Sequence, residues 1–388
     1  MTIEWYRWVE WIIKAVISTA VLLAGFAYMT WAERKVAALV QTRIGPNRVG
    51  PFGLLQPVAD GIKLIFKEEL IPGGADKLIF LLAPVITVVP AFIILAVVPW
   101  GPPVPNFYGP GQDLPLGIAD LNVGMMYILS VASIAVYGVT LGGWASNNKY
   151  ATLGGLRSAA QMVSYELALG LSVVGPLLLA GSMSLLDIAD AQSFRAGQWP
   201  WFIFVQPLAA LIFYLAGLAE VNRAPFDMPE AEQELTAGYH TEYSGMKFAL
   251  FFMAEYIKMI GVSAIFATLF LGGWQGPFVY QFPWLGIVYF WGKVIASLVF
   301  MIWTRSTLPR LRYDRLMAFG WKVLLPAALV NVLVTAAALL GDAVLLSVVL
   351  GALGVVVLLV IFYAFSRRRR PAPAARPFPA APGRGAAD

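Results

Sequence analysis

Long apolar runs separated by short polar segments are the main pattern along this chain. About 20 consecutive apolar residues cross the roughly 30 Å hydrocarbon layer of a bilayer as a helix, so each long run predicts one membrane-spanning helix. Nine runs are long enough, and they lie near residues 11–32, 78–99, 121–144, 159–181, 201–221, 246–271, 285–304, 322–341 and 343–365. The pattern predicts an all-α fold, a polytopic integral membrane helical bundle with about nine transmembrane helices.

The polar segment 33–77 contains one further predicted helix. Two Gly-Pro pairs break the chain in its first half. After them Leu54, Val58, Ile62 and Ile65 recur at helical spacing, with the polar side chains mostly on other faces. This pattern predicts an amphipathic helix that lies at the membrane surface.

The positions of Lys and Arg predict the orientation of the bundle. Basic residues concentrate in alternate loops, and the opposite side holds little beyond Arg7 and Arg195. Short loops rich in Lys and Arg stay in the cytoplasm. We therefore expect a multi-pass membrane protein with its N-terminus outside and its C-terminus cytoplasmic. Residues 1–366 form a single transmembrane domain in this interpretation, and residues 367–388 form a basic, low-complexity tail predicted to be disordered.

Composition agrees with a membrane protein and limits its chemistry. Of the 388 residues, 59% are hydrophobic and 13% are charged, against roughly 25% charged in soluble domains. The chain has no Cys and a single histidine, His240. It therefore cannot bind a Cys-ligated iron–sulfur cluster or a bis-His haem by itself. If the protein takes part in redox chemistry, partner chains must carry the electrons.

An acidic cytoplasmic loop, residues 222–246, lies between two apolar runs and is flanked by further acids. The acids of the loop and its flanks are Glu220, Asp227, Glu230, Glu232, Glu234, Glu242 and Glu255. Acids so close to spanning helices are costly unless protons, cations or polar partners use them. For Glu230 and Glu232 a solvated loop is a sufficient explanation. For Glu220 and Glu255, at the edges of apolar runs, it is not.

Other ionisable residues lie within the predicted helices themselves. Glu166 lies in the fourth run, Lys258 in the sixth and Lys293 in the seventh. Mutual pairing is one explanation, since Glu255 and Lys258 are spaced i,i+3 on one helix. Glu166 and Glu220 have no basic residue one turn away, so each needs water or a partner on another helix. Carboxylates in series can also relay protons through a membrane. The predicted order of the relay is Glu166, Glu220, Asp227, Glu232 and Glu234, then Glu255.

Four segments resemble one known family. They are ERKVAALVQTRIGPNRVGPFGLLQPVADGIKLIFKE, GGWASNNKYATLGGLRSAAQMVSYELALG, NRAPFDMPEAEQELTAGYHTEYSGMKFALFFMAEY and RSTLPRLRYDRLMAFGWK. Together they resemble the quinone-site membrane subunit of respiratory complex I. The resemblance extends over almost all of residues 11–341. The ninth predicted helix and the basic tail are not shared by every relative, and we interpret them as lipid-facing packing and a contact with anionic headgroups.

The resemblance implies a proton-pumping NADH:quinone oxidoreductase, a translocase that needs partner chains. Quinone is the substrate, while NADH, FMN and the iron–sulfur clusters belong to other subunits. The implied partners are peripheral-arm subunits that carry the terminal cluster, small membrane subunits, antiporter-like membrane subunits and membrane lipid, with no nucleic acid. The chain would anchor the peripheral arm and wall the chamber that the quinone enters. The positions that match the chamber motifs are Ala32 to Arg34, Arg48, Phe52, Gln56, Asp60 and Phe226.

The same resemblance implies that Glu166, Glu220, Asp227, Glu232, Glu234 and Glu255 start a proton path toward the antiporter-like neighbours. Some relatives carry a further acid in the third helix, where this chain has Ser133. Water or Tyr137 would then bridge the gap. Three alternatives stay open: a related hydrogenase-linked subunit, a stand-alone cation transporter and a purely structural anchor. The complete acidic-loop motif favours the quinone enzymes, and the chain lacks the internal repeats that are common in transporters.

Overall fold

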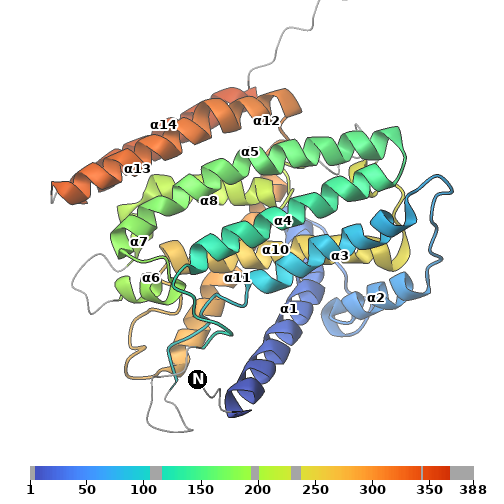
Figure 1. Ribbon diagram of the computed structural model, residues 1–388, viewed down its shortest axis with the longest axis horizontal. Helices are drawn as coiled ribbons and strands as arrows, with labels where there is room; N and C mark the ends of the chain where they lie inside the picture. Colours follow the sequence, from blue (N-terminus) through green and yellow to red (C-terminus); the bar gives the residue numbers. More distant parts are fainter. Residues whose placement is uncertain (1–4, 105–115, 194–200, 229–236, 342–343, 368–388) are drawn as a thin grey trace, which may run out of the picture.

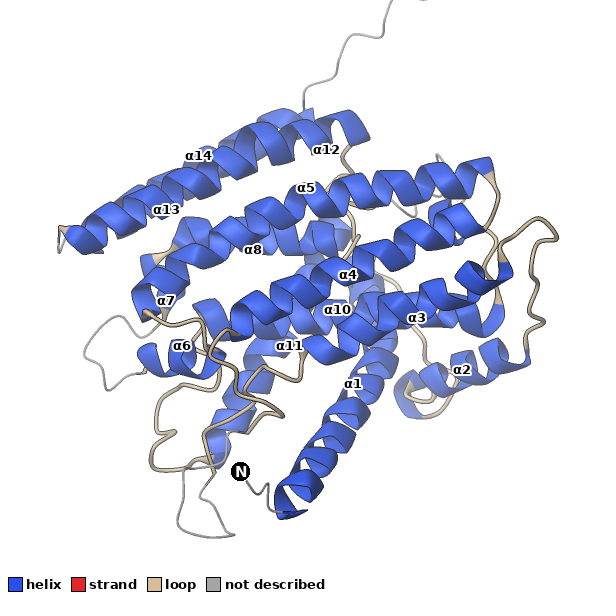
Figure 2. Ribbon diagram, in the orientation of Figure 1, coloured by secondary structure: helices blue, strands red, loops and turns tan. Residues whose placement is uncertain are grey.

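The computed structural model describes residues 5–104, 116–193, 201–228, 237–341 and 344–367. Within these ranges all regular secondary structure is helical, as Figure 2 shows by its blue ribbons and tan loops. The predicted all-α class is confirmed for this part of the chain.

Eight helical stretches are long and apolar enough to cross a membrane. Their helices are α1 (Trp5–Val40), α3 (Lys77–Ile94), α4 (Gly124–Ala145), α5 (Lys149–Ala180), α10 (Gly245–Phe270), α11 (Trp284–Thr307), α13 (Leu325–Leu340) and α14 (Val344–Arg367). The stretch that contains α13 begins with α12 (Tyr313–Phe319) and a π-helical turn η3 (Gly320–Leu324). Each of the predicted apolar runs except the fifth corresponds to one of these stretches.

The fifth apolar run differs from its prediction, because it is broken and short. It forms α7 (Phe202–Val205) and α8 (Pro207–Glu220), separated at Gln206. Proline at the start of α8 supplies no backbone N–H and favours a new helix start. The 14 residues of α8 rise only about 21 Å, less than the roughly 30 Å of a bilayer core. Its C-terminal residue, Glu220, therefore lies inside the bundle.

The break is stabilised by hydrogen bonds to α13. The Gln206 side-chain amide donates to Thr335 Oγ1 at 2.7 Å and accepts from Asn331 Nδ2 at 2.9 Å. All three side chains are buried. Because lipid offers no partner for polar groups, a polar side chain at membrane depth needs one inside the protein.

Two predicted loops are partly helical. Helix α1 continues to Val40, so residues 33–40 extend it beyond the predicted end at residue 32. Helix α5 begins at Lys149, ten residues before its predicted start. Both extensions contain good helix formers such as Ala, Leu, Lys and Arg, and α1 ends before the Gly-Pro breaks. Hydropathy detects the apolar length of a helix and misses its polar ends.

The predicted amphipathic helix is present as α2 (Gln56–Phe66), but Leu54, which was predicted on its apolar face, lies at the end of the preceding turn. It follows the short 3₁₀ turn η1 (Pro51–Gly53), and its apolar residues Val58, Ile62 and Ile65 are exposed in this single chain. In Figure 1, α2 lies at the edge of the bundle beside α1 and α10. The apolar face of α2 is thus available to a membrane or a partner chain.

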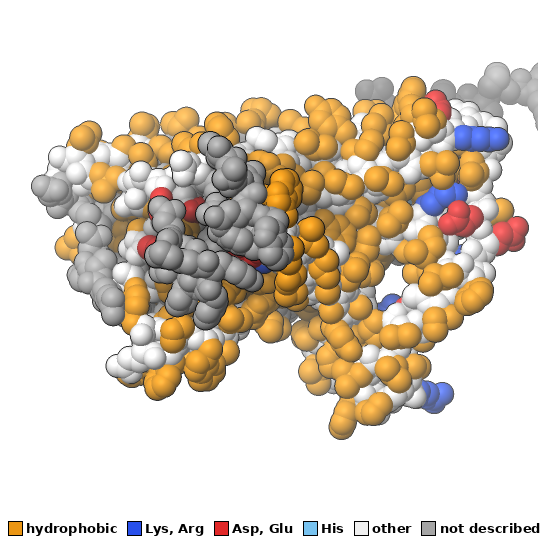
Figure 3. All heavy atoms as spheres, turned by 60° about the horizontal axis from the view of Figure 1, so that its bottom comes forward, with side chains coloured by type: hydrophobic (Ala, Val, Ile, Leu, Met, Phe, Trp, Pro, Cys, Tyr) orange, Lys and Arg blue, Asp and Glu red, His pale blue; other side chains and the backbone are white. Residues whose placement is uncertain are grey.

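The remaining helices form the body of the bundle. Figure 1 shows α3, α4 and α5 side by side, with α13 and α14 together at one end. The buried core lies among α5, α8 and α10. The short helix α6 (Leu185–Ala191) and the turn η2 (Gly238–His240) complete the described elements. Figure 3 shows hydrophobic side chains over most of one face, with Lys, Arg and acidic side chains near the right edge and a few acidic side chains at the left, as expected for a bilayer-embedded protein.

Candidate functional site

A pocket of about 320 Å³ lies between α1, α2 and α10. Its walls are mostly apolar and include Phe26, Phe248 and Phe252. Its charged side chains include Arg34 of α1 and Asp60 of α2, whose Nη1 and Oδ2 atoms are 2.7 Å apart. An apolar hollow with a few convergent polar groups is the usual form of a small-molecule site.

Most of the residues expected to wall a quinone chamber lie at or near this pocket. Arg34 and Asp60 line it, and Gln56 Nε2 donates to Asp60 Oδ1 at 3.2 Å. The carbonyl of Phe52 accepts a hydrogen bond from Trp31 Nε1 at 3.2 Å, so η1 lies against α1. This carbonyl contact ties the segment before α2 to the helix that carries Arg34.

The other expected residues lie elsewhere. Ala32 lines a separate hollow between α1, α10 and α11, and Glu33 is buried on the inner side of α1. The Arg48 side chain is exposed in the turn before η1. Phe226 is completely buried, with its ring centroid 5.5 Å from that of Tyr165 on α5. The structure therefore brings Arg34, Phe52, Gln56 and Asp60 together and places Phe226, which belongs to the acidic loop, in the buried core.

Immediately behind Arg34, the neighbouring residue Glu33 points into the bundle and is 8% exposed. Its carboxylate forms an ion pair with Arg305 of α11 and accepts a hydrogen bond from Tyr256 Oη at 2.5 Å. Arg223 Nη1 lies 3.6 Å from Glu33 Oε1. A buried carboxylate survives in such surroundings only when cations and donors replace its water.

Arg223 extends this cluster toward α10. Its Nη2 atom lies 3.6 Å from Glu255 Oε2, and its guanidinium carbon lies 4.5 Å from the centroid of the Tyr256 ring. Tyr239 Oη donates to Glu255 Oε1 at 3.3 Å. We call Glu33, Arg223, Glu255 and Arg305 the charged cluster. It links α1, the loop after α8, α10 and α11.

The pairing of Glu255 with Lys258 considered from their spacing is wrong. Lys258 Nζ lies 3.5 Å from Glu220 Oε1 on α8, while Glu255 faces Arg223. The short length of α8 explains this, since it ends with Glu220 at the depth of Lys258. Glu220 therefore has the interhelical partner that the sequence required and could not name.

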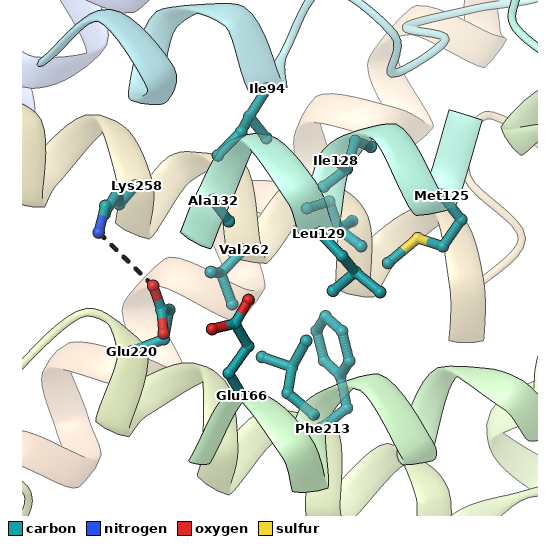
Figure 4. A pocket seen from close by; sticks show the side chains of 12 residues that line it. Ile94, Met125, Ile128, Leu129, Ala132, Glu166, Phe213, Glu220, Lys258 and Val262 are labelled. Carbon is teal, nitrogen blue, oxygen red and sulfur yellow. Dashed lines mark ion pairs between the residues drawn. The ribbon is translucent and has the colours of Figure 1, made fainter. Parts of the chain in front are cut away.

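Beyond Glu220 lies a small cavity of about 40 Å³ lined by Glu166, Glu220, Lys258 and apolar side chains. In Figure 4 the carboxyl groups of Glu166 and Glu220 both point into it from neighbouring helices. A cavity of this size can accommodate a water molecule, which needs two to four polar partners. The cavity thus brings together two carboxyl groups from residues that are far apart in the sequence.

On the far side of this cavity Glu166 contacts α4. Ser133 Oγ lies within hydrogen-bond distance of both Glu166 Oε1 and the carbonyl oxygen of Leu129, the latter at 3.0 Å, and its single O–H can donate to either one. Tyr137, expected as a possible bridge, is two-thirds exposed, and Ser133 makes the contact directly. Ser133 is therefore itself the neighbour of Glu166.

Asp227 is half-buried, and its backbone carbonyl accepts two hydrogen bonds from the Arg310 guanidinium at 3.2 and 3.0 Å. Glu232 and Glu234 lie outside the described residues. The proton-path prediction can therefore be compared with the structure only at Glu166, Glu220, Asp227 and Glu255.

Lys293 does not pair with an acid in the described structure. Its ammonium donates to the carbonyls of Leu271, Gly273 and Gln275 at 2.5, 2.9 and 2.7 Å, and lies 5.1 Å from the Trp201 ring centroid. These carbonyls follow the C-terminal end of α10, where a cation is favoured. Its role is to close the end of a helix.

His240, the single histidine, lies in η2 and is packed by aromatic rings. Tyr239, Phe248 and Phe252 surround it with centroid distances of 4.9, 5.3 and 6.3 Å. Burial lowers the pKa of His240 to about 4. Its side chain is therefore neutral near pH 7.

Sequence reasoning missed three contributors to the charged cluster. From the sequence, Arg223 and Arg305 served only to predict the membrane orientation. Glu33 was named only as one position of a motif expected to line the quinone chamber. Glu33 follows a long apolar run on the same helix, which is a detectable signal for burial. No local signal identifies Arg223 and Arg305 as the partners of Glu33, because these three residues are far apart in the sequence. Within the described residues, no group of three or more His, Cys, Asp or Glu is arranged to hold a metal ion.

Comparison with known proteins assigns the family. A family model described as NADH dehydrogenase matches residues 13–336. One NADH-quinone oxidoreductase H subunit of Geobacter metallireducens is 55% identical over 315 residues, which cover 81% of this chain and 92% of that protein. The NADH-quinone oxidoreductase H subunit of Thermomicrobium roseum is 51% identical over 334 residues, covering 85% of this chain and 96% of that one. The family match ends before α14. This chain therefore belongs to the NADH dehydrogenase family, together with the H subunits of NADH-quinone oxidoreductase.

Proposed function

We propose that this subunit of an oxidoreductase complex walls a quinone chamber and couples quinone reduction to proton movement through its buried charges. The observation that carries the proposal is the adjacency of Glu33 and Arg34 on α1. Arg34 faces the apolar pocket beside Asp60, while Glu33 faces the charged cluster. A change of charge in the pocket therefore acts on the cluster over the distance between neighbouring residues.

The pocket supplies the binding half of the proposal. A quinone has an apolar ring and tail with two polar carbonyl oxygens, which suits an apolar pocket with a few polar side chains. Arg34 and Asp60 would position the ring as it passes. Since this chain has no Cys and one histidine, partner subunits with NADH, FMN and iron–sulfur clusters would supply the electrons.

The buried charges supply the coupling half. From the pocket inward, they follow the order Glu33, Arg223 and Glu255, then Lys258 and Glu220, then Glu166 and Ser133. The cavity between Glu220 and Glu166 would hold the water that passes a proton between them. A proton lost or gained at one carboxylate changes the energy of charge at the next, because low dielectric strengthens Coulomb interactions.

The proposal also covers the membrane location of the chain and its partner subunits. The chain would lie in the bacterial inner membrane with its N-terminus outside, and α2 with the acidic loop would anchor the peripheral arm. Small and antiporter-like membrane subunits would receive the proton path beyond Ser133.

A coupled assay on the whole complex tests this function. The purified complex in liposomes would be supplied with NADH and a short-chain quinone, and quinone reduction and proton uptake would be followed together. We expect inhibitor-sensitive reduction with uptake, and a lower ratio of protons to electrons in Glu220→Gln and Glu166→Gln. A wild-type ratio in both variants would contradict the relay. Hydrogen-dependent reduction in place of NADH-dependent reduction would contradict the assigned donor.

A further inference from the structure

A second hollow lies on another side of α1, between α1, α10 and α11. We call it the α1–α11 groove. It has a volume of about 320 Å³, and all its lining residues are aliphatic, aromatic, methionine or glycine. The pocket beside α2 uses Phe26, Thr30 and Arg34 of α1, whereas this groove uses Val21 and Ala32. Helix α1 therefore separates two distinct hollows.

The length of the groove fits one leaflet of a bilayer. On α1 its lining runs from Val21 to Ala32, a rise of about 16 Å at roughly 1.5 Å per residue. The hydrocarbon core of a bilayer is about 30 Å thick, so one leaflet contributes about half of that. A single acyl chain that extends from the surface toward the midplane has this length.

The groove leads to a cation at one end. On α11 its lining residues Trp291, Ile295, Leu298 and Ile302 recur every three or four positions, and the next residue in this row is Arg305. Arg305 pairs with Glu33, yet 37% of its side chain remains exposed. A guanidinium has five N–H donors, so one carboxylate leaves donors available.

We propose that the α1–α11 groove binds a phospholipid, with an acyl chain along α11 and the phosphate at Arg305. Arginine is well suited to phosphate because its planar fork matches the phosphate oxygens. The tail of a quinone could fill an apolar groove equally well, but a quinone head carries no charge, whereas a phosphate has the negative charge that complements the Arg305 guanidinium. The exposed guanidinium therefore favours a phospholipid. This inference goes beyond the proposed quinone and proton functions and does not depend on them.

Filling the groove tests the proposal directly. Ile295 is 56% exposed, so Ile295→Trp places a larger ring in the groove without disturbing the core. Val288→Trp is the matched control, since Val288 lies two turns away on the same helix, is 55% exposed and does not line the groove. Native mass spectrometry of the complex in mild detergent would count the retained phospholipids. We expect Ile295→Trp to lose a phospholipid that the wild type and the control retain. Equal counts in all three would overturn the proposal.

A photoreactive benzophenone side chain at Val299, which lines the groove, identifies the occupant independently. A cross-link to phospholipid is expected after illumination of native membranes. A cross-link to quinone, or to a partner polypeptide, would overturn the proposal even if the lipid count changed. Quinone reduction measured in the same samples separates this result from the proposed chamber, because neither Ile295 nor Val299 lines the pocket beside α2.

Discussion

Glu220, the last residue of α8, lies 3.5 Å from Lys258 of α10, and both side chains are almost completely buried. Two charges at this depth stabilise each other only as a pair, since neither has bulk water. The pair also lines the cavity that faces Glu166. The same contact therefore supports the packing of two helices and, in our proposal, carries a step of the proton path.

We expect Lys258→Met to destabilise the protein by about 3–5 kcal/mol, because it leaves Glu220 buried without its cation. The double variant Lys258→Met, Glu220→Gln removes both charges and should recover most of this loss. The midpoint of thermal unfolding of the purified complex measures the stability. Recovered stability without recovered proton pumping would separate the two roles of the pair. Losses that simply add in the double variant would contradict the pairing.

Ser133→Ala should slow coupled turnover by about tenfold or more, because a hydrogen bond to a charged group contributes roughly 1.5–3 kcal/mol. The control is Ser130→Ala on the same helix, since Ser130 is exposed and bonds to the carbonyl of Met126. The measurement is NADH-driven proton uptake in liposomes. If both serine variants pump alike, Ser133 is not part of the path.

Asp60→Ala should raise the KM for a short-chain quinone by about tenfold, which corresponds to about 1.4 kcal/mol, with a smaller change in kcat. Asp60 holds Arg34 and Gln56 at the pocket, so its loss disturbs binding before chemistry. Lys67→Ala is a suitable control, because Lys67 is exposed directly after α2 and does not line the pocket. An unchanged KM in Asp60→Ala would remove this residue from the chamber wall.

Acid should destabilise the segment around His240. The pKa of His240 is about 4 in the folded protein and about 6.5 in an unfolded chain, so the unfolded state binds a proton first as pH falls. The stability that neutral His240 contributes is complete above pH 6.5 and is lost as pH falls toward 4, up to about 3 kcal/mol.

His240→Phe removes this titration and keeps an aromatic ring among Tyr239, Phe248 and Phe252. Thermal unfolding midpoints of both proteins between about pH 7.5 and about pH 4.5 provide the test. Carboxylates titrate in both, so only the difference reports on His240. We expect the variant to lose less stability over this range, and parallel curves would contradict the assignment.

The amino-acid pattern was sufficient for the class of fold and for most of its elements. Lipid excludes unpaired backbone groups, so a run of about 20 apolar residues has one stable form, and hydropathy finds it. A second local signal located α2, because its apolar positions recur with the 3.6-residue period of a helix. Motifs of adjacent residues likewise identified the family.

What the sequence could not supply are relationships between distant residues. The pairing of Glu220 with Lys258 depends on where α8 ends, and that end depends on the break at Gln206, which α13 stabilises. The charged cluster joins Glu33 and Arg223 across almost two hundred positions, at 3.6 Å. Buried ion pairs form where packing brings the groups together and excludes water. Local composition reveals that such charges need partners, and only the tertiary structure decides which partners they have.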